Sequence, residues 1–261
     1  MKARNRKWLV KPSPNFMKIC RFEYQGRIRT GILEPEHGKV IDYETKEVWP
    51  ISDVKMLLPA DPTKIVCVGR NYAEHAAELG NEVPREPLLF LKAPSALIGN
   101  GEKIVIPPQS QQVEHEGELA VVIANNCKNL TENDDPLAYV LGYTCLNDVT
   151  ARDVQRRDVQ FTRGKSFDTF CPVLNFLETE LDVRDLRVRT RVNGVVKQDG
   201  RTSQMVFPVD FLIRYISQQM TLNPGDIIAT GTPAGVSKMV SGDRCEVEIE
   251  GIGILGNVVT G

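Results

Sequence analysis

Three acidic residues, Glu114, Glu116 and Glu118, alternate along one stretch that continues as an apolar, β-branched run, Leu119–Ile123. This pattern predicts a strand that enters a buried sheet, and alternate side chains of a strand point to the same face. Carboxylates gathered on one buried face repel one another and are costly to desolvate, so a hard divalent cation with oxygen ligands would stabilise them. Alternating charge is also common on a solvent-facing edge strand, and this stretch alone leaves both interpretations open.

Two further charged residues stand in loops that follow strand-like segments. Asp148 comes soon after the apolar segment 142–146, and Lys165 lies in a polar loop. Loops at strand ends often carry functional groups on a rigid scaffold. Taken alone, Asp148 is more typical of a cap on a helix that begins near Thr150, and Lys165 of a solvent-exposed lysine.

His75 and Glu78 stand three residues apart on a predicted short helix, residues 73–79, which Gly80 ends. This spacing places both side chains on one face of the helix. A histidine oriented by a carboxylate can act as a general base. A surface ion pair is an equally good interpretation of the same spacing.

The loop from Thr230 to Gly235 follows a predicted strand and contains two threonines and two glycines. Backbone N–H groups in such a loop can bind a carboxylate. The loop lacks the lysine and the spacing of a phosphate-binding P-loop, which argues against nucleotide binding. An ordinary glycine turn is the alternative.

The chain divides into three predicted parts. Residues 1–16 hold two prolines and no periodic pattern, which is typical of a flexible arm. Residues 17–62 form a small N-terminal β domain with strands at about 18–24, 28–33 and 40–43. A connector with two prolines, residues 57–63, separates it from a larger domain, residues 63–261, which carries all the candidate residues.

Strands dominate the larger domain. Asn193-Gly194, flanked by β-branched residues, predicts a hairpin. One clear amphipathic helix is expected at 208–220, ended by Asn223-Pro224-Gly225. Without regular strand-helix alternation, the expected class is β-rich and mixed α/β, a rolled or sandwiched sheet. Predicted strands lie at 64–69, 88–91, 103–106, 118–124, 138–146, 226–230 and 245–250, the last two closing the chain.

Composition narrows the classes of partner. The 261 residues carry a net charge of −2, which argues against nucleic acid and membrane surfaces as partners. The six cysteines show no C-x-x-C pairing and lie in apolar surroundings, as expected of reduced thiols in the cytoplasm. Basic residues cluster from Lys2 to Lys11, but the apolar run there is too short for a signal peptide or membrane span.

From Ile65 to its end the chain resembles the fumarylacetoacetate hydrolase family. Five blocks occur in the family's order, and together they span about three quarters of the chain. The blocks are Val68–His75, His115–Ile123, Asp148–Gln155, Lys165–Pro172 and Gly225–Pro233.

The resemblance implies roles for individual residues. Mg²⁺ or Mn²⁺ would be bound by Glu116, Glu118 and Asp148, which leaves Glu114 outside the metal site. Lys165 would be the active-site lysine, and His75 and Glu78 the histidine-glutamate pair of a segment that orders over the substrate. Arg70, Gln155 and Thr232 would contact the substrate. The family also implies a β-sandwich roll and a homodimer.

The implied function is divalent-metal-dependent chemistry on a 2-oxo, 2,4-dioxo or 2-hydroxy-dienoic carboxylic acid through an enolate. Two features favour a keto–enol isomerase or tautomerase, of the oxaloacetate or 2-hydroxyhepta-2,4-diene-1,7-dioate type. The small N-terminal β unit and the block Phe167–Pro172 resemble that branch, and the segment between Gln155 and Lys165 is short, whereas acylpyruvate hydrolases tend to carry a longer insertion. Val173–Asn175 departs from the glycine-proline pair that often follows the block.

Alternatives remain at this point. One is a C–C bond hydrolase of acylpyruvates or fumarylpyruvate, and another is an oxaloacetate decarboxylase. A third is a non-catalytic β-sandwich that binds a metal ion, which would leave His75, Glu78 and Lys165 without a task.

Overall fold

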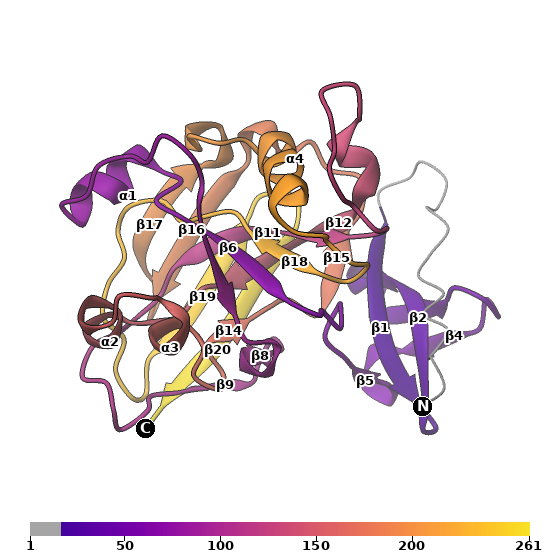
Figure 1. Cartoon of the computed structure of the whole chain (residues 1–261). Coiled ribbons are helices and arrows are strands. Elements are labelled where there is room, and N and C mark those ends of the chain that lie inside the picture. Colours follow the sequence, from indigo (N-terminus) through magenta and orange to yellow (C-terminus); the bar gives the residue numbers. More distant parts are fainter. Residues whose placement is uncertain (1–16) are drawn as a thin grey trace, which may run out of the picture.

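The computed structural model describes residues 17–261, so the predicted arm at residues 1–16 lies outside the described residues. Strands dominate the described part of the chain and the α-helices are few, which confirms the β-rich mixed α/β class. Figure 1 shows a larger body, in which strands of two sheets cross, beside a small unit formed by the first five strands.

The largest sheet joins the small unit to the body. Its strands are hydrogen-bonded in the order β4-β3-β2-β1-β15-β12-β11-β18-β6-β7, and β5 also pairs with β1. Strand β11 is buried at every residue, because Leu119, Val121 and Ile123 enter one apolar cluster and Ala120 and Val122 enter another. The strands of the body in this sheet are β6 (Ile65–Gly69), β7 (Leu88–Lys92), β11 (Gly117–Ile123), β12 (Val140–Asn147), β15 (Phe176–Glu178) and β18 (Ile227–Ala229).

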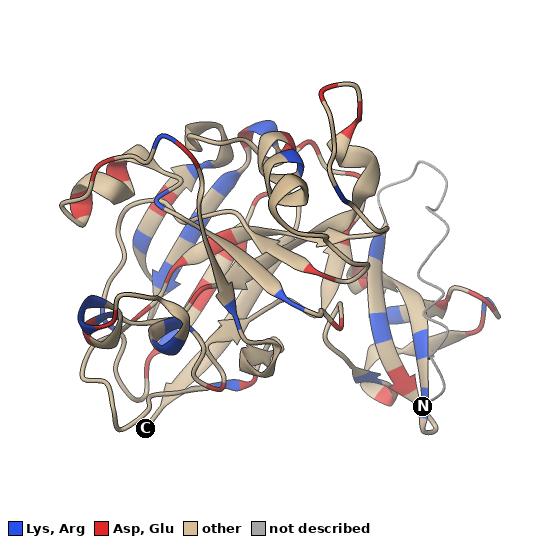
Figure 2. Cartoon of the chain, in the orientation of Figure 1, with Lys and Arg blue, Asp and Glu red and all other residues tan. Residues whose placement is uncertain are grey.

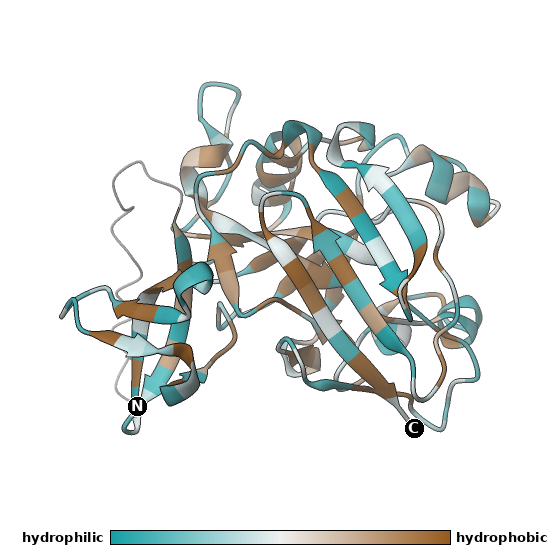
Figure 3. Cartoon of the chain, turned by 180° about the vertical axis from the view of Figure 1, so that it is seen from behind, coloured by the Kyte–Doolittle hydropathy of each residue, from teal (hydrophilic) through white to brown (hydrophobic). Residues whose placement is uncertain are grey.

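A second sheet packs against β11 and β12, with strand order β17-β16-β19-β20-β9. Its inner face packs with helix α4 (Val209–Gln219) and the first sheet in the main core. Its outer face is polar, so burial alternates along β16 and β19. Figure 3 shows this alternation as bands of colour near the C-terminus. The bounds are β9 (Lys103–Val105), β16 (Arg187–Val192), β17 (Val195–Arg201), β19 (Arg244–Ile249) and β20 (Gly253–Thr260).

The N-terminal unit has its own apolar cluster around Phe22 and Val40. Strand β1 pairs with β15 as well as with β2, so the unit is hydrogen-bonded to the body. The predicted boundary at 57–63 falls between β5 and β6, in a stretch without strand or helix. Acidic and basic residues are interspersed over unit and body alike (Figure 2). The unit contains β1 (Lys18–Tyr24), β2 (Arg27–Glu34), β3 (Lys39–Asp42), β4 (Val48–Pro50) and β5 (Lys55–Met56).

Short elements complete the chain. Two strand pairs are β8 (Leu97–Ile98) with β14 (Cys171–Pro172), and β10 (Val113–Glu114) with β13 (Thr150–Ala151). The α-helices are α1 (Ala73–Glu78), α2 (Arg152–Arg157), α3 (Thr162–Lys165) and α4 (Val209–Gln219). Single 3-10 turns lie at Pro35–His37, Ile51–Asp53, Pro94–Ala96, Pro136–Tyr139, Val183–Asp185 and Thr202–Gln204.

Several predicted elements are confirmed. Helix α4 buries Val209, Leu212, Ile213 and Ile216, as its periodicity indicated. The hairpin turn at Asn193 and Gly194 has positive φ at both residues. All six cysteines are free and buried.

Several strands were missed, among them β20 and β15 of the two main sheets. The strand predicted at 245–250 was expected to be the last of the chain, but β20 follows it and pairs with both β19 and β9. Gly253, Gly256 and Asn257 interrupt the apolar pattern of β20, which hid it. Strand β15 is only three residues long, too short for an alternating pattern to be recognised.

Candidate active site

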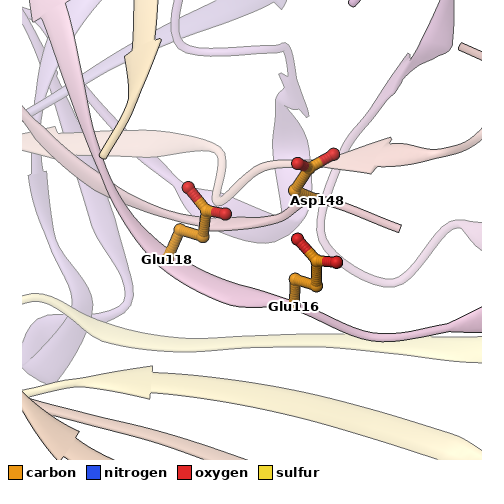
Figure 4. Close-up of side chains that lie close together, drawn as sticks. All are labelled: Glu116, Glu118 and Asp148. Carbon is orange, nitrogen blue, oxygen red and sulfur yellow. The ribbon is translucent and has the colours of Figure 1, made fainter. Parts of the chain in front are cut away.

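Glu116, Glu118 and Asp148 meet where the paired strands β11 and β12 end. Glu118 is the second residue of β11, Glu116 directly precedes that strand, and Asp148 directly follows β12. The register sets Gly117 opposite Asn147, and the N–H of Asp148 donates to the carbonyl of Glu116 at 2.8 Å. One oxygen of each carboxylate lies within 4.8 Å of the others, and all three residues are buried. Figure 4 shows the three side chains gathered at one point.

The predicted continuous strand through the alternating acids is wrong, because β10 ends at Glu114 and β11 begins three residues later. Glu114 is not part of the cluster of three and accepts a hydrogen bond from Arg152 Nε at 2.7 Å. His115 contacts the second sheet, with Nδ1 3.1 Å from Gln198 Oε1, and its Nε2 lies 2.9 Å from Ser237 Oγ. Burial lowers the pKa of His115, which disfavours the protonated form of its ring.

Three buried cations surround the carboxylates. Lys165 Nζ lies 2.7 Å from both Glu116 Oε2 and Asp148 Oδ2. Lys92 Nζ donates to Asp148 Oδ1 at 2.6 Å, and Arg152 Nη2 donates to Glu116 Oε1 at 2.5 Å. Lys165 is not the solvent-exposed lysine that its loop suggested, because it is only 2% exposed. Asp148 is not a helix cap, because its side chain bonds to lysines and α2 has no side-chain cap.

Glu118 is the carboxylate that these cations leave uncompensated. Its Oε2 accepts a hydrogen bond from the N–H of Gly231 at 2.7 Å, but burial and the negative charges of Asp148 and Glu116 raise its pKa well above the usual range. The pKa of Glu116 is lowered despite burial, chiefly because the positive charge of Lys165 lies beside it. Three buried oxygen ligands with an unbalanced negative charge fit a hard divalent cation such as Mg²⁺ or Mn²⁺.

The predicted histidine-glutamate pair lies on α1. His75 Nδ1 is 3.3 Å from Glu78 Oε2, and His75 is 4% exposed, so the pair is not a simple surface ion pair. The Glu78 carboxylate also accepts a hydrogen bond from the N–H of Gly235 at 3.0 Å. Asn71 anchors the start of this segment, because its side-chain amide donates to the carbonyls of Phe207 and Thr230 at 3.0 and 2.7 Å.

All nine residues proposed from the sequence line a single cavity of about 410 Å³. They are Arg70, His75, Glu78, Glu116, Glu118, Asp148, Gln155, Lys165 and Thr232. The cavity combines the carboxylate cluster, the histidine-glutamate pair and several cationic side chains, so a small anionic molecule bound in it can contact all three kinds of group.

The three candidate substrate contacts differ in their hydrogen bonds. Within the described part of the chain the Arg70 side chain has no hydrogen-bond or ion-pair partner. Its φ of +58° is left-handed, a strained conformation that clusters at functional sites. Gln155 Oε1 accepts from Arg152 Nη1 at 2.6 Å. Thr232 Oγ1 donates to the carbonyl of Gly117 at 2.8 Å, so its hydroxyl proton is already committed.

Sequence reasoning missed several residues of the site, and four of them stand out by their contacts. Lys92 and Arg152 bind the carboxylates, and Phe90 and Phe161, which line the cavity, pack edge to face with ring centroids 5.5 Å apart. Lys92 does leave a signal, since it is a lysine at the end of an apolar strand. Arg152 lies inside one of the five quoted blocks but was given no role.

Two family models match the chain. The model described as fumarylacetoacetate (FAA) hydrolase C-terminal matches residues 64–260, and one described as Rv2993c-like, N-terminal, matches residues 17–59. The chain belongs to the fumarylacetoacetate hydrolase family. The family model covers the cavity and all nine candidate residues.

Relatives in this family are named after different activities. The human mitochondrial oxaloacetate tautomerase FAHD2A is 44% identical over 225 residues, which cover 81% of this chain and 71% of that protein. The structure of 5-carboxymethyl-2-hydroxymuconate delta-isomerase from Mycobacterium smegmatis has a TM-score of 0.86 and 40% identity, covering 94% of this chain and 98% of that one. Fumarylpyruvate hydrolase from Pseudomonas aeruginosa, solved with Mn²⁺ and pyruvate, has a TM-score of 0.73 and 28% identity, covering 84% and 93%.

These similarities confirm the fold and the general class of activity. The chain is a fumarylacetoacetate hydrolase family enzyme, and enzymes of this family are isomerases, tautomerases or hydrolases that depend on a divalent metal ion. Among the helices at residues 17–261, none has the length and apolar character needed to span a membrane.

Proposed function

We propose that this protein is a keto–enol isomerase or tautomerase of a 2-oxo dicarboxylic acid, of the oxaloacetate or 2-hydroxyhepta-2,4-diene-1,7-dioate type, and that it uses Mg²⁺ or Mn²⁺. The observation that carries the proposal is the single cavity in which the carboxylate cluster, the lysine and the histidine-glutamate pair meet. The relatives named as tautomerase and isomerase are 44% and 40% identical, and one named fumarylacetoacetate hydrolase is 39% identical, so the choice of the isomerase branch rests on the short segment between Gln155 and Lys165.

A divalent ion held by Glu116, Glu118 and Asp148 would act as a Lewis acid toward the oxygens of a 2-oxo acid. Lys165 adds positive charge beside these ligands, because the negative charges of Asp148 and Glu116 raise the pKa of its ammonium despite burial. The protonated lysine offsets negative charge on a bound anion.

His75 is the proposed base. If its Nδ1–H donates to Glu78, the lone pair lies on Nε2, and Nε2 accepts the proton from C3 of the bound acid. Tautomerisation is complete when a proton reaches the keto oxygen, and the reverse reaction returns a proton to C3. Neither direction of the reaction requires water. The reaction can therefore take place in an active site that closes over its substrate and excludes solvent.

Arg70 is the proposed contact for the second carboxylate of the substrate. It lines the cavity, and no described side chain pairs with its guanidinium. An arginine binds a carboxylate through charge-assisted, often bidentate hydrogen bonds. This contact favours dicarboxylic over monocarboxylic 2-oxo acids.

One feature favours C–C hydrolysis as a second candidate function. The Glu78 side chain is 33% exposed, so its carboxylate can reach a water molecule and activate it for attack on a carbonyl carbon. The homodimer and the cytoplasmic location stay predictions.

A turnover panel with Mg²⁺ or Mn²⁺ tests the proposal, using oxaloacetate, a dienedioate, acetylpyruvate and fumarylpyruvate. We expect keto–enol interconversion of oxaloacetate or isomerisation of the dienedioate to be faster than any cleavage. Faster cleavage of either acylpyruvate would favour the hydrolase. If no compound is turned over and none shifts the melting temperature, the non-catalytic alternative gains.

A further inference from the structure

Each carboxylate of the cluster has one oxygen bonded to a donor that belongs to a different element. Asp148 Oδ1 accepts from Lys92 on β7, and Glu116 Oε1 accepts from Arg152 on α2. Glu118 Oε2 accepts from the backbone N–H of Gly231, in the loop after β18. The other oxygens of Glu116 and Asp148 are bonded to a single group, Lys165 Nζ, at 2.7 Å each, so a cation that binds these two carboxylates meets Lys165 there and the three donors named above on the opposite oxygens.

Lys92 is the most deeply buried of these donors. Its side chain is 0% exposed, and within residues 17–261 its ammonium hydrogen-bonds only to Asp148 and the carbonyl of Val149, at 2.6 and 3.2 Å. Burying an ammonium is costly unless it is paired, so the position of Lys92 depends on Asp148. Lys92 is not among the residues that line the cavity, which keeps it from touching a substrate.

The two lysines bonded to Asp148 lie on opposite oxygens. Lys165 Nζ contacts Oδ2 of Asp148 and also Oε2 of Glu116, and it lines the cavity. Lys92 contacts Oδ1 from the buried side. The oxygens on the cavity side are therefore Asp148 Oδ2 and Glu116 Oε2, and the opposite oxygen of Asp148 is fixed by Lys92.

We propose that Lys92 is a positioning residue that restricts Asp148 to coordination through one oxygen and thereby favours Mg²⁺ or Mn²⁺ over Ca²⁺. Mg²⁺ requires near-ideal octahedral geometry with short bonds, which single carboxylate oxygens suit. Ca²⁺ takes six to eight oxygens and often binds carboxylates through both. The inference rests on the metal site of the proposed function and adds the selectivity of that site.

The test is calorimetric titration of the full chain with Mg²⁺, Mn²⁺ and Ca²⁺, for wild type and Lys92→Met. Loss of one positive charge changes the affinity for all divalent ions alike, so the ratio of Kd values separates coordination from charge. Removing a partner of a metal ligand typically lowers metal affinity about 10- to 100-fold. If that loss falls on Mg²⁺ and spares Ca²⁺, the preference for Mg²⁺ over Ca²⁺ should fall by about 10-fold or more. Lys64→Met is the matched control, because Lys64 pairs with Asp226 outside the cavity, and its ratio should equal that of wild type.

A second measurement needs no variant and covers the case in which Lys92→Met does not fold. In a crystal structure of the wild type with Mn²⁺, Asp148 should bind the ion through Oδ2 alone while Lys92 stays on Oδ1. Bidentate Asp148 would overturn the inference, as would an unchanged Kd ratio in Lys92→Met. A wild type that binds none of the three ions would instead remove the metal site and the proposed function.

Discussion

Replacing Arg70 by glycine is expected to keep or raise stability while lowering activity on dicarboxylic substrates. The φ of +58° at Arg70 costs a residue with a Cβ about 1–2 kcal/mol. Glycine removes this cost but adds conformational entropy to the unfolded chain, worth about 0.5–1 kcal/mol. The free energy of unfolding should therefore change by about 0 to +1.5 kcal/mol, which raises Tm by at most about 3–6 °C.

The activity should move the other way. A hydrogen bond to a charged group is worth about 1.5–3 kcal/mol, so loss of the guanidinium should lower kcat/KM for oxaloacetate about 10- to 150-fold. Arg70→Met is the matched control, since it loses the charge but keeps the strained backbone. It should show the same loss of activity without the gain in stability.

The assays are differential scanning calorimetry and steady-state kinetics with Mn²⁺, with acetylpyruvate as a substrate that has one carboxylate. An equal loss of kcat/KM on acetylpyruvate would show that Arg70 does not recognise the second carboxylate. A Tm that falls equally in both variants would refute the argument from backbone strain.

Three other predictions concern the metal ligands, the base and a distant carboxylate. Glu116→Gln, Glu118→Gln and Asp148→Asn should each weaken Mn²⁺ binding in calorimetry and abolish turnover, because each removes a charged ligand; unchanged affinity in all three would exclude the metal site. His75→Ala should keep Mn²⁺ affinity while kcat falls about 10²- to 10⁴-fold, and full activity would remove His75 from the mechanism. The pKa of Asp226 is held below its usual range despite burial, by hydrogen bonds from Lys64 and the N–H of Asn223. The stabilisation that ionised Asp226 gives should therefore be present above about pH 4 and lost as pH falls further. Asp226→Asn should lower Tm at pH 7, and the Tm of this variant should fall less steeply with acid than that of wild type.

The periodic patterns in the sequence predicted most of the scaffold. The helix at 208–220 and the hairpin at Asn193-Gly194 are determined by local signals, so both could be read from the residues alone. Strand β20 could not, because Gly253 and Gly256 weaken the pattern and pairing with β19 and β9 stabilises the strand instead. Long-range pairing leaves no trace in a short window of sequence.

For the site, too, local patterns predicted one part and long-range strand pairing determined the rest. The alternation predicted that Glu116 and Glu118 share a face, and they do, on the side of Ala120 and Val122. It also placed Glu114 there, which is wrong because the strand is interrupted between Glu114 and Gly117. Whether a strand continues depends on its partners, and β10 pairs with β13 instead of β12.

The cations of the site were harder to predict because they come from distant segments. Lys92 and Asp148 are 56 residues apart, and Arg152 and Glu114 are 38 apart. A lysine or arginine considered alone is typical of an exposed position. Burial of its charge can be predicted only when the carboxylate that pairs with it is known.

The balance of charge explains why Glu118 differs from its neighbours. Four buried carboxylates, Glu114, Glu116, Glu118 and Asp148, face three buried cations, and every cation bonds to at least one of the other three acids. Glu118 is left with a backbone N–H, and its pKa is raised. A divalent ion would supply the missing positive charge beside Glu118 and would leave the cluster with a net positive charge. Such a cluster attracts an anionic substrate and stabilises the further negative charge that develops when a proton leaves C3.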